Sequence, residues 1–396
     1  MTIAPQHRLY SCFFLFAVTT GALMSRLPDI QTDLGVSESQ LGLTMIGMSI
    51  GSLISLTFGA AIIERLGVRT TAFLTVLGPA LLFALIPWLG AAPLVFAALF
   101  VTGLLSGALE INLNVEIDRL EMHTGGRFMN RAHGFWSVGF FVTALAGASI
   151  RQSGLSVQWH LALVALVVVL VGGFMISGIR PAPAPKRTES ENTHRIAFPN
   201  LGLVPLCIIG FAAFLVEGAG IDWSAIYMRD VFAVQPFIGG MGLTLFAFFM
   251  AVMRLSADPV VARFGPRNVA MVLLILATLG ALMVGFAPSP SLALAGFALM
   301  GIGCSAVYPL AVSAAAQRTD RPAAVNVAAL GQVSFVVFFL APPLLGFVAE
   351  YLGIRNSYLV CVPLLLAGLW AANTALGNSK SPAPADLRAE PVSPHA

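Results

Sequence analysis

Twelve apolar runs, each long enough to cross a membrane as a helix, constrain this chain more than any other feature of its sequence. They lie near residues 8–28, 38–63, 70–90, 93–117, 132–151, 159–179, 200–226, 236–261, 268–287, 291–316, 324–349 and 356–377. Crossing the hydrocarbon core takes about 20 apolar residues as a helix, because lipid offers no hydrogen-bonding partner to exposed backbone groups. Since the alternation typical of membrane β-strands is absent, the sequence predicts an all-α integral membrane protein with twelve transmembrane helices.

The composition agrees with this prediction. Hydrophobic residues make up 58% of the chain and charged residues only 10%, whereas a soluble domain carries roughly a quarter charged residues. Too few polar side chains remain to cover a globular surface, which excludes a soluble protein. The first apolar run could imitate a signal peptide, but it is too long and lacks a clear cleavage site, so we expect it to be retained.

The distribution of basic residues predicts an orientation. With the N-terminus in the cytoplasm, only four arginines fall outside: Arg26, Arg151, Arg229 and Arg355. Most other Lys and Arg residues then lie in cytoplasmic loops and tails, as positive charges in membrane proteins usually do. We therefore expect both termini to be cytoplasmic. The net charge of +3 calls for no nucleic-acid partner.

A segment rich in proline and charge divides the chain into two halves. It reads "RPAPAPKRTESENTHRIAFPN" (180–200) and has no apolar periodicity. We predict a six-helix half at 1–179, a cytoplasmic linker at 180–199, a second six-helix half at 200–378 and a disordered cytoplasmic tail at 379–396. The motifs "RLGVR" (65–69) and "RFGPR" (263–267) occupy equivalent places in the two halves, which indicates an internal duplication of a kind common in transporters.

The loop "GAAIIERLGVR" (59–69) resembles the signature between the second and third helices of the major facilitator superfamily. Alanine replaces the leading glycine of that signature at Ala60, and Ala262 replaces the acidic residue in the second copy. The resemblance implies two six-helix halves that rock about a central site, with these loops holding the cytoplasmic side closed. The implied gating residues are Glu64, Arg65, Arg69, Arg263 and Arg267.

Five longer stretches resemble one bacterial branch of that superfamily, the MosC-like and YbjJ-like membrane proteins, with a more distant similarity to fucose-permease-type sugar symporters. They are "SRLPDIQTDLGVSESQLG" (25–42), "LEINLNVEID" (109–118), "HGFWSVG" (133–139), "EGAGIDWSAIYMRD" (217–230) and "LAPPLLGFVAE" (340–350). Glu110 departs from the branch, where Asp is expected, as does Ala341, where Gly usually precedes Pro-Pro. The resemblance implies a transporter of the bacterial inner membrane for a small polar solute of the sugar, polyol or inositol-amine (rhizopine) class.

Ionisable residues inside apolar spans are candidates for function because they are costly to place there. Glu110 and Asn114 share a face of the fourth span, and we expect them to line a central cavity; a structural polar clasp between helices is the alternative. Glu110 is also the first candidate for proton coupling, since a carboxyl group in a low dielectric can load and release a proton. On the fifth span, His133 and Ser137 share a face beside Trp136. These three are further substrate-binding candidates, with a structural latch for His133 and core packing for Trp136 as alternatives.

The seventh span places Glu217 deep in the membrane, and Asp222 and Trp223 nearer its outer end. The two carboxylates differ by roughly 140° around a continuous helix, and Gly218 and Gly220 between them suggest a bend. Glu217 is therefore a candidate for substrate binding and proton coupling, while Asp222 and Trp223 are candidates for a gate. For Trp223 and Tyr227 we favour a simpler place in the aromatic belt at the membrane surface.

Arg26, at the end of the first span, is expected to pair across the halves with Asp222 or Asp230 when the outer side closes. On the eighth span, Arg254 and Asp258 are four residues apart and are expected to form a structural pair. In the second half, Tyr308, Gln332 and Phe335 are polar or aromatic insertions in apolar spans and complete the substrate-binding candidates.

The sequence thus predicts a proton-coupled transporter of a small hydroxylated solute, working as a monomer in lipid without a cofactor or metal. Efflux of drugs or metabolites by proton antiport, and a receptor that does not transport, are the alternatives. We do not expect an enzyme, because no nucleophile triad, metal spacing or phosphate loop stands out in the sequence. The four cysteines fall within apolar runs and receive no role.

Overall fold

The computed structural model describes residues 3–183 and 199–377, and the described chain is helical, without strands. The predicted linker lies mostly outside these residues, as does the predicted tail. The first half contains α1 (Pro5–Ser25), α2 (Leu27–Leu34), α3 (Glu38–Phe58), α4 (Ala60–Leu66), α5 (Val68–Leu85), the 3-10 turn η1 (Ile86–Trp88), α6 (Ala92–Thr124), α7 (Met129–Gln152) and α8 (Val157–Ser177). The second contains η2 (Leu201–Leu203), α9 (Val204–Phe232), α10 (Pro236–Phe264), α11 (Pro266–Gly285), α12 (Pro290–Cys304), α13 (Val307–Ala316), α14 (Ala323–Leu352), α15 (Asn356–Leu359) and α16 (Cys361–Ala375).

Twelve spans in the described residues are long and apolar enough to cross a membrane, which confirms the predicted helix count. Two of these spans differ in detail from the apolar runs that mark them. The fourth span was expected to stop near residue 117, but α6 continues to Thr124, because hydropathy marks where the lipid ends and not where the helix ends. The tenth span is divided between α12 and α13 around Ser305 and Ala306.

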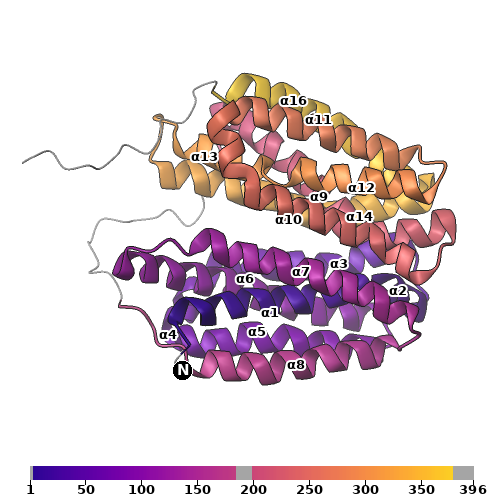
Figure 1. The fold of residues 1–396 in the computed structure, drawn as a ribbon, viewed down its shortest axis with the longest axis horizontal. Coiled ribbons are helices and arrows are strands. Elements are labelled where there is room, and N and C mark those ends of the chain that lie inside the picture. The colour runs from indigo at the N-terminus through magenta and orange to yellow at the C-terminus, as the bar shows by residue number, and fades with distance from the viewer. Residues whose placement is uncertain (1–2, 184–198, 378–396) are drawn as a thin grey trace, which may run out of the picture.

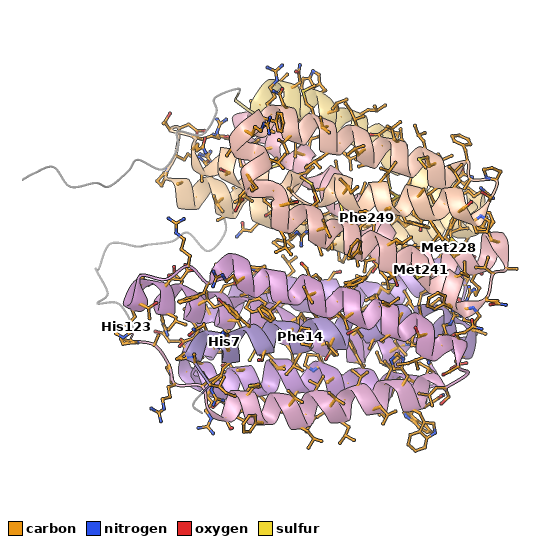
Figure 2. The ribbon with its side chains drawn as sticks, in the orientation of Figure 1. His7, Phe14, His123, Met228, Met241 and Phe249 are labelled. Carbon is orange, nitrogen blue, oxygen red and sulfur yellow. The ribbon has the colours of Figure 1, made fainter. Side chains whose placement is uncertain are left out.

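The helices form two bundles, one from each half of the sequence (Figure 1). The first helix of each half is the most enclosed, with 78% of the apolar stretch of α1 and 61% of that of the η2–α9 span buried, against 33–56% in the other ten spans. Figure 2 shows His7 and His123 at one end of the molecule and Met228 and Met241 towards the other. We call the first the α4 end and the second the α2 end, after the short helix at each (Figure 1).

In the part of the chain that the structure describes, the buried side chains of the first half that pack with the second half lie towards the α2 end. One buried cluster joins side chains such as Leu23, Met45 and Phe140 of the first half to Trp223 and Leu345 of the second. In the part of the first half nearer the α4 end, a separate cluster packs α1, α5, α6, α7 and α8 onto one another without buried members from the second half. Figure 1 shows the same arrangement, since the ribbons of the two bundles lie close at the α2 end and diverge towards the α4 end.

The repeated loops at the α4 end share one backbone conformation. Gly67 has φ 76° and ψ 159°, and Gly265 has φ 82° and ψ 151°. Each glycine ends one helix and directly precedes the next, in a region of φ that residues with a Cβ rarely adopt. The two halves therefore repeat in structure at the position where "RLGVR" and "RFGPR" repeat in sequence.

Candidate transport site and gate

The polar group in the middle of α6 consists of Glu110 and Asn114. Asn114 Nδ2 donates to Glu110 Oε2 at 3.0 Å, as their four-residue spacing on one helix face allows. The other polar atom of the amide, Asn114 Oδ1, is buried and has no hydrogen-bond partner within the described chain. Buried polar atoms are normally satisfied, so this oxygen is free to accept from a solute or a water molecule.

The candidates on α7 mostly serve packing in this conformation. The Ser137 hydroxyl donates to the backbone oxygen of His133 at 3.1 Å, and Trp136 stacks on Phe140 with ring centroids 5.3 Å apart. The His133 ring lies against Phe13, with centroids 5.1 Å apart. No hydrogen bond in the described residues joins these side chains to Glu110 or Asn114. Within the described residues, the His133 and Trp136 side chains make ring contacts but no hydrogen bond.

In the second half, Glu217 is paired with an arginine from a neighbouring helix. Arg254 Nη2 of α10 lies 3.9 Å from Glu217 Oε2 of α9, and Arg254 Nε donates to the backbone oxygen of Ser305 at 3.2 Å. The expected pair between Arg254 and Asp258 is therefore wrong. The four-residue spacing considered only one helix, whereas the guanidinium reaches across to α9.

Asp222 lies one turn beyond Glu217, in a helix that is continuous through both glycines. The bend expected at Gly218 and Gly220 is not needed, because Gly220 instead makes room for the ring of Phe246, which a Cβ would overlap. Asp222 is half-buried and makes no hydrogen bond or ion pair within the described residues. It does not form the expected pair with Arg26 here.

Trp223 and Tyr227 do not belong to an interfacial belt, and that expectation is wrong. Both side chains are 0% exposed, and Tyr227 donates its hydroxyl to the backbone oxygen of Val284 at 2.6 Å. The reason is the enclosed position of α9, which leaves no face for lipid over these turns. The exposed tryptophans lie on outer helices instead: Trp88, Trp159 and Trp370.

An aromatic group surrounds Phe214, one turn before Glu217 on α9. The Phe214 ring lies 4.4 Å from that of Tyr308, 4.5 Å from that of Phe338 and 5.5 Å from that of Phe335, between centroids. Tyr308 is on α13, while Phe335 and Phe338 are on α14 together with Gln332. The structure therefore brings Tyr308 and Phe335 of the predicted site to the neighbourhood of Glu217.

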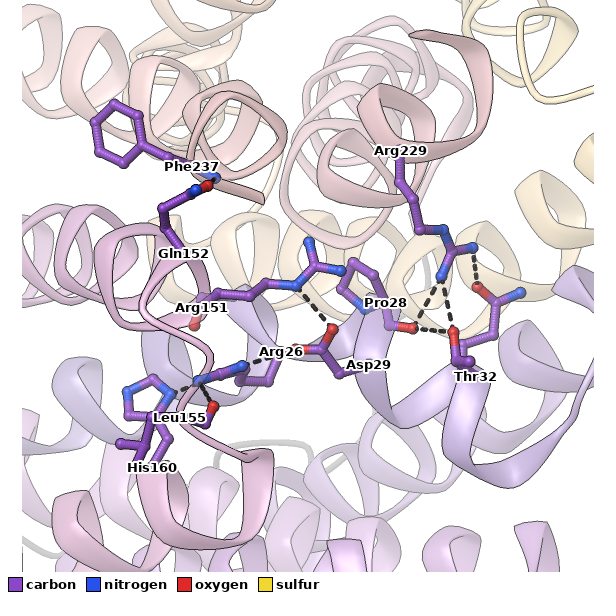
Figure 3. Close-up of polar contacts among 12 residues, drawn as sticks. Arg26, Pro28, Asp29, Thr32, Arg151, Gln152, Leu155, His160, Arg229 and Phe237 are labelled. Atoms are coloured by element: carbon purple, nitrogen blue, oxygen red, sulfur yellow. Dashed lines mark hydrogen bonds and ion pairs between the residues drawn. The ribbon is translucent and has the colours of Figure 1, made fainter. Parts of the chain in front are cut away.

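At the α2 end, Arg229 of α9 joins the second half to the first. Its guanidinium donates to the backbone oxygen of Pro28 at 2.8 Å, to Gln31 Oε1 at 2.8 Å and to Thr32 Oγ1 at 3.3 Å, all on α2 (Figure 3). Other hydrogen bonds join the halves within the described residues. Gln152 Oε1 accepts from the backbone N–H of Phe237 at 3.1 Å, and Glu350 Oε2 accepts from the backbone N–H of Ser39 at 3.1 Å. Ser49 Oγ donates to the backbone oxygen of Phe338 at 2.6 Å.

Arg26 stays within its own half, so its expected pairing with Asp222 or Asp230 does not occur in this conformation. It is 3% exposed and donates to Asp29 Oδ2 at 2.9 Å, to the Leu155 oxygen at 2.7 Å and to His160 Nδ1 at 2.9 Å (Figure 3). Asp29 also binds Arg151, with Nε and Oδ1 2.7 Å apart. The physical reason is reach: the chain turns at Arg26 into α2, which aims the guanidinium back towards α8.

The loop residues at the α4 end do not join the halves in this conformation. Glu64, Arg65, Arg69 and Arg263 are exposed, and in the described chain none of them forms a bond to the opposite half. Arg267 donates to Asn373 Oδ1 in its own half. Their gating role therefore stays a prediction for a conformation in which the α4 end is closed.

Comparisons with known proteins agree with this geometry. The sequence profile of the Major Facilitator Superfamily matches residues 9–216 and 206–395. An uncharacterized transporter, y4wD, of Sinorhizobium fredii is 29% identical over 94% of this chain and 97% of its own length. The membrane protein MosC of Rhizobium meliloti is 26% identical over 90% of this chain and 86% of its own length.

Among solved structures, a D-xylose-proton symporter superposes with a TM-score of 0.75 at 13% identity, covering 94% of this chain and 97% of that one. At this identity the likeness concerns the fold alone. Together with the family match, it confirms the predicted architecture of two six-helix halves. The chain belongs to the Major Facilitator Superfamily, and it is a multi-pass membrane transporter and not an enzyme.

Proposed function

We propose that this transporter moves a small polar solute of the sugar, polyol or inositol-amine class across the bacterial inner membrane, coupled to protons. The observation that carries the proposal is a pair of intramembrane carboxylates, one in each half. The C-terminus of α6 and the N-terminus of α9 both lie at the α4 end. At a rise of 1.5 Å per residue, Glu110 lies about 21 Å along α6 from that end, and Glu217 lies about 20 Å along α9 from it. They therefore stand at a similar depth in the two bundles.

The neighbours of these carboxylates suit a hydroxylated solute. Asn114 offers a free amide oxygen beside Glu110, and Arg254 offers donors beside Glu217. The rings of Tyr308 and Phe335 pack on Phe214, one turn before the second carboxylate on α9, and would cover the apolar face of a sugar ring. Charged groups in a membrane are retained for such pathways because their cost must be offset by function.

The four arginines Arg26, Arg151, Arg229 and Arg355 lie at the α2 end, and the loops with Arg65 and Arg263 at the α4 end. On the usual bias of positive charge, the α4 end is cytoplasmic. The conformation with a closed α2 end is then the inward-facing one, and transport follows from alternating closure of the two ends.

Uptake into proteoliposomes under an imposed pH gradient tests the coupling. Glu110→Gln should abolish the dependence of uptake on the pH gradient, because the amide cannot carry a proton. Asp118→Asn is the matched control, since Asp118 is an exposed carboxylate on the same helix, and it should transport like the wild type. Unchanged pH-driven uptake in Glu110→Gln would contradict the proposal.

A thermal-shift screen with sugars, inositols and amines tests the solute class. Stabilisation should appear with hydroxylated solutes and weaken in Glu217→Gln, because binding to the folded state raises its stability. Stabilisation by lipophilic cations alone would instead favour drug efflux, for which the exposed ring of Phe335 would be the better anchor.

A further inference from the structure

His160 forms a buried hydrogen bond that the transport site does not use. It lies one turn into α8 and is 2% exposed, and its Nδ1 is 2.9 Å from Nε of Arg26. Arg26 is 3% exposed and also donates to Asp29 Oδ2 and to the Leu155 oxygen. Figure 3 shows these four residues at the α2 end, beside Arg151.

The bond fixes the protonation state of the ring. The Nε atom of an arginine carries a hydrogen and can only donate. His160 Nδ1 must therefore present its lone pair, so the imidazole is neutral, with its hydrogen on Nε2. A second proton on Nδ1 would set two N–H groups against each other and place two buried cations in contact. The Arg26 bond and a doubly protonated His160 exclude one another.

The charges that face His160 come from three elements. The turn between α1 and α2 contributes Arg26, α2 contributes Asp29, and α7 contributes Arg151, which binds Asp29 at 2.7 Å. From α7, Gly147 also lies against the ring. Two arginines thus surround one carboxylate, and the carboxylate already serves both. A proton added to His160 therefore has no free anion to pair with among these groups. The repulsion between the protonated ring and the Arg26 guanidinium then breaks their hydrogen bond.

The second half also binds α2, the short helix that follows Arg26. Arg26 immediately precedes α2, and Arg229 of α9 binds Pro28, Gln31 and Thr32 within α2. Loss of the Arg26 bond would therefore loosen the helix on which the contact between the halves at this end depends.

We propose that His160 is a proton-binding site that controls the α2 end: protonation breaks its bond to Arg26, frees α2 and lets the two halves separate there. Transport of a particular solute is not required, and neither is a proton on Glu110, so this inference goes beyond the proposed function. A transporter that carried its coupling proton elsewhere would still open its α2 end at low pH through His160.

Distances between spin labels test the proposal without any solute. Cysteines introduced at Ser153 and Ser291 place one label on each half at the α2 end, both at exposed positions. The four native cysteines are free and buried, which limits labelling elsewhere. In nanodiscs, lowering the pH from 8 to 4 should increase the population with the longer distance. One linked proton changes the ratio of the two populations by at most about tenfold per pH unit.

His160→Gln keeps a neutral acceptor and removes the titration, so it should hold the short distance at both pH values. His7→Gln is the control, because His7 is exposed at the α4 end, and it should respond like the wild type. A pH response in His160→Gln equal to that of the wild type, or no response in the wild type, would overturn the proposal.

A second measurement covers the case in which His160→Gln fails to fold. Imidazole nitrogen NMR shifts of the labelled wild type should show His160 taking up its second proton over the pH range in which the distance changes. A ring that stays neutral while the distance lengthens would overturn the proposal. Because neither readout involves solute uptake, a failure here is separable from a failure of the Glu110 experiment.

Discussion

The α2 and α4 ends of this transporter are built from similar numbers of helices but are joined in different ways. At the α2 end, Arg229, Gln152 and Glu350 each link one half to the other by hydrogen bonds, over a shared apolar core. At the α4 end, Arg65 and Arg263 are exposed and face no partner in the opposite half within the described residues. The difference shows that, in this conformation, the halves are held together by particular contacts at the α2 end and not along the whole length of the two bundles.

The largest effect is expected where the halves touch backbone to backbone. Gly42 of α3 packs on the Pro342 carbonyl of α14, which a Cβ would overlap. Gly42→Ala should therefore force α3 and α14 apart and cost about 3 kcal/mol in the conformation closed at the α2 end. The accessibility of a cysteine placed at the α2 end to a polar maleimide should rise accordingly.

Gly173→Ala is the matched control for that change, because Gly173 lies on α8 with no atom within 4 Å of an added Cβ. It should leave maleimide accessibility unchanged. Equal accessibility in both variants would show that the α3–α14 contact does not hold this end closed.

An intermediate effect is expected for Arg229→Ala, which removes three hydrogen bonds to α2. Hydrogen bonds to charged groups contribute roughly 1.5–3 kcal/mol, less where they are exposed, so the closed population should fall about tenfold or more. Spin-label distances across the α2 end would measure the shift.

Arg355→Ala serves as the control for Arg229, since Arg355 lies at the same end but donates to the Ala287 oxygen of its own half at 2.6 Å. It should keep the distance between the halves. A comparable opening in Arg355→Ala would mean that the net positive charge at this end, and not the bonds to α2, determines closure.

The smallest effect is expected at the α4 end, where Asp320 binds Arg318, Asn200 and Asn326 within one half. The Arg318 guanidinium, with hydrogen bonds from the two amides, holds the pKa of Asp320 far below its ordinary value. Because the folded pKa is lowered, the stabilisation is present above the ordinary Asp pKa and is lost only as the pH falls through the folded value.

Asp320→Asn should therefore lower the thermal unfolding temperature by no more than a few degrees, and by the same amount at pH 7 and at pH 5. It should leave the spin-label distance at the α2 end unchanged. A difference in unfolding temperature that vanished at pH 5 would contradict the assigned pKa direction.

The helix count, the family and the repeat could be predicted from the sequence because each depends on local features. Apolar length marks a span, and the glycine of "RLGVR" and "RFGPR" marks a turn with positive φ. The shared face of Glu110 and Asn114 was also predictable, since both lie on one helix. These features need no knowledge of how the helices pack.

The partners of charged residues could not be predicted, because they depend on which helices lie side by side. Arg254 has Asp258 four residues away on its own helix, yet it pairs with Glu217 of α9. Trp223 and Tyr227 stand near the end of an apolar run like belt residues, yet α9 is enclosed and buries both. The contact between His160 and Arg26 could not be predicted either, because a single histidine at the start of a span forms no sequence pattern that indicates its partner.

The central claim is that the two ends close alternately, with the Arg229 contacts holding the α2 end closed here. Spin labels at Ser153 and Ser291 report the α2 end, and labels at Thr70 and Asn268, three residues after the two repeated glycines, report the α4 end. In Arg229→Ala the first distance should lengthen while the second shortens. If the first distance lengthened with the second unchanged, or neither moved, the two ends would not be coupled and the account would be wrong.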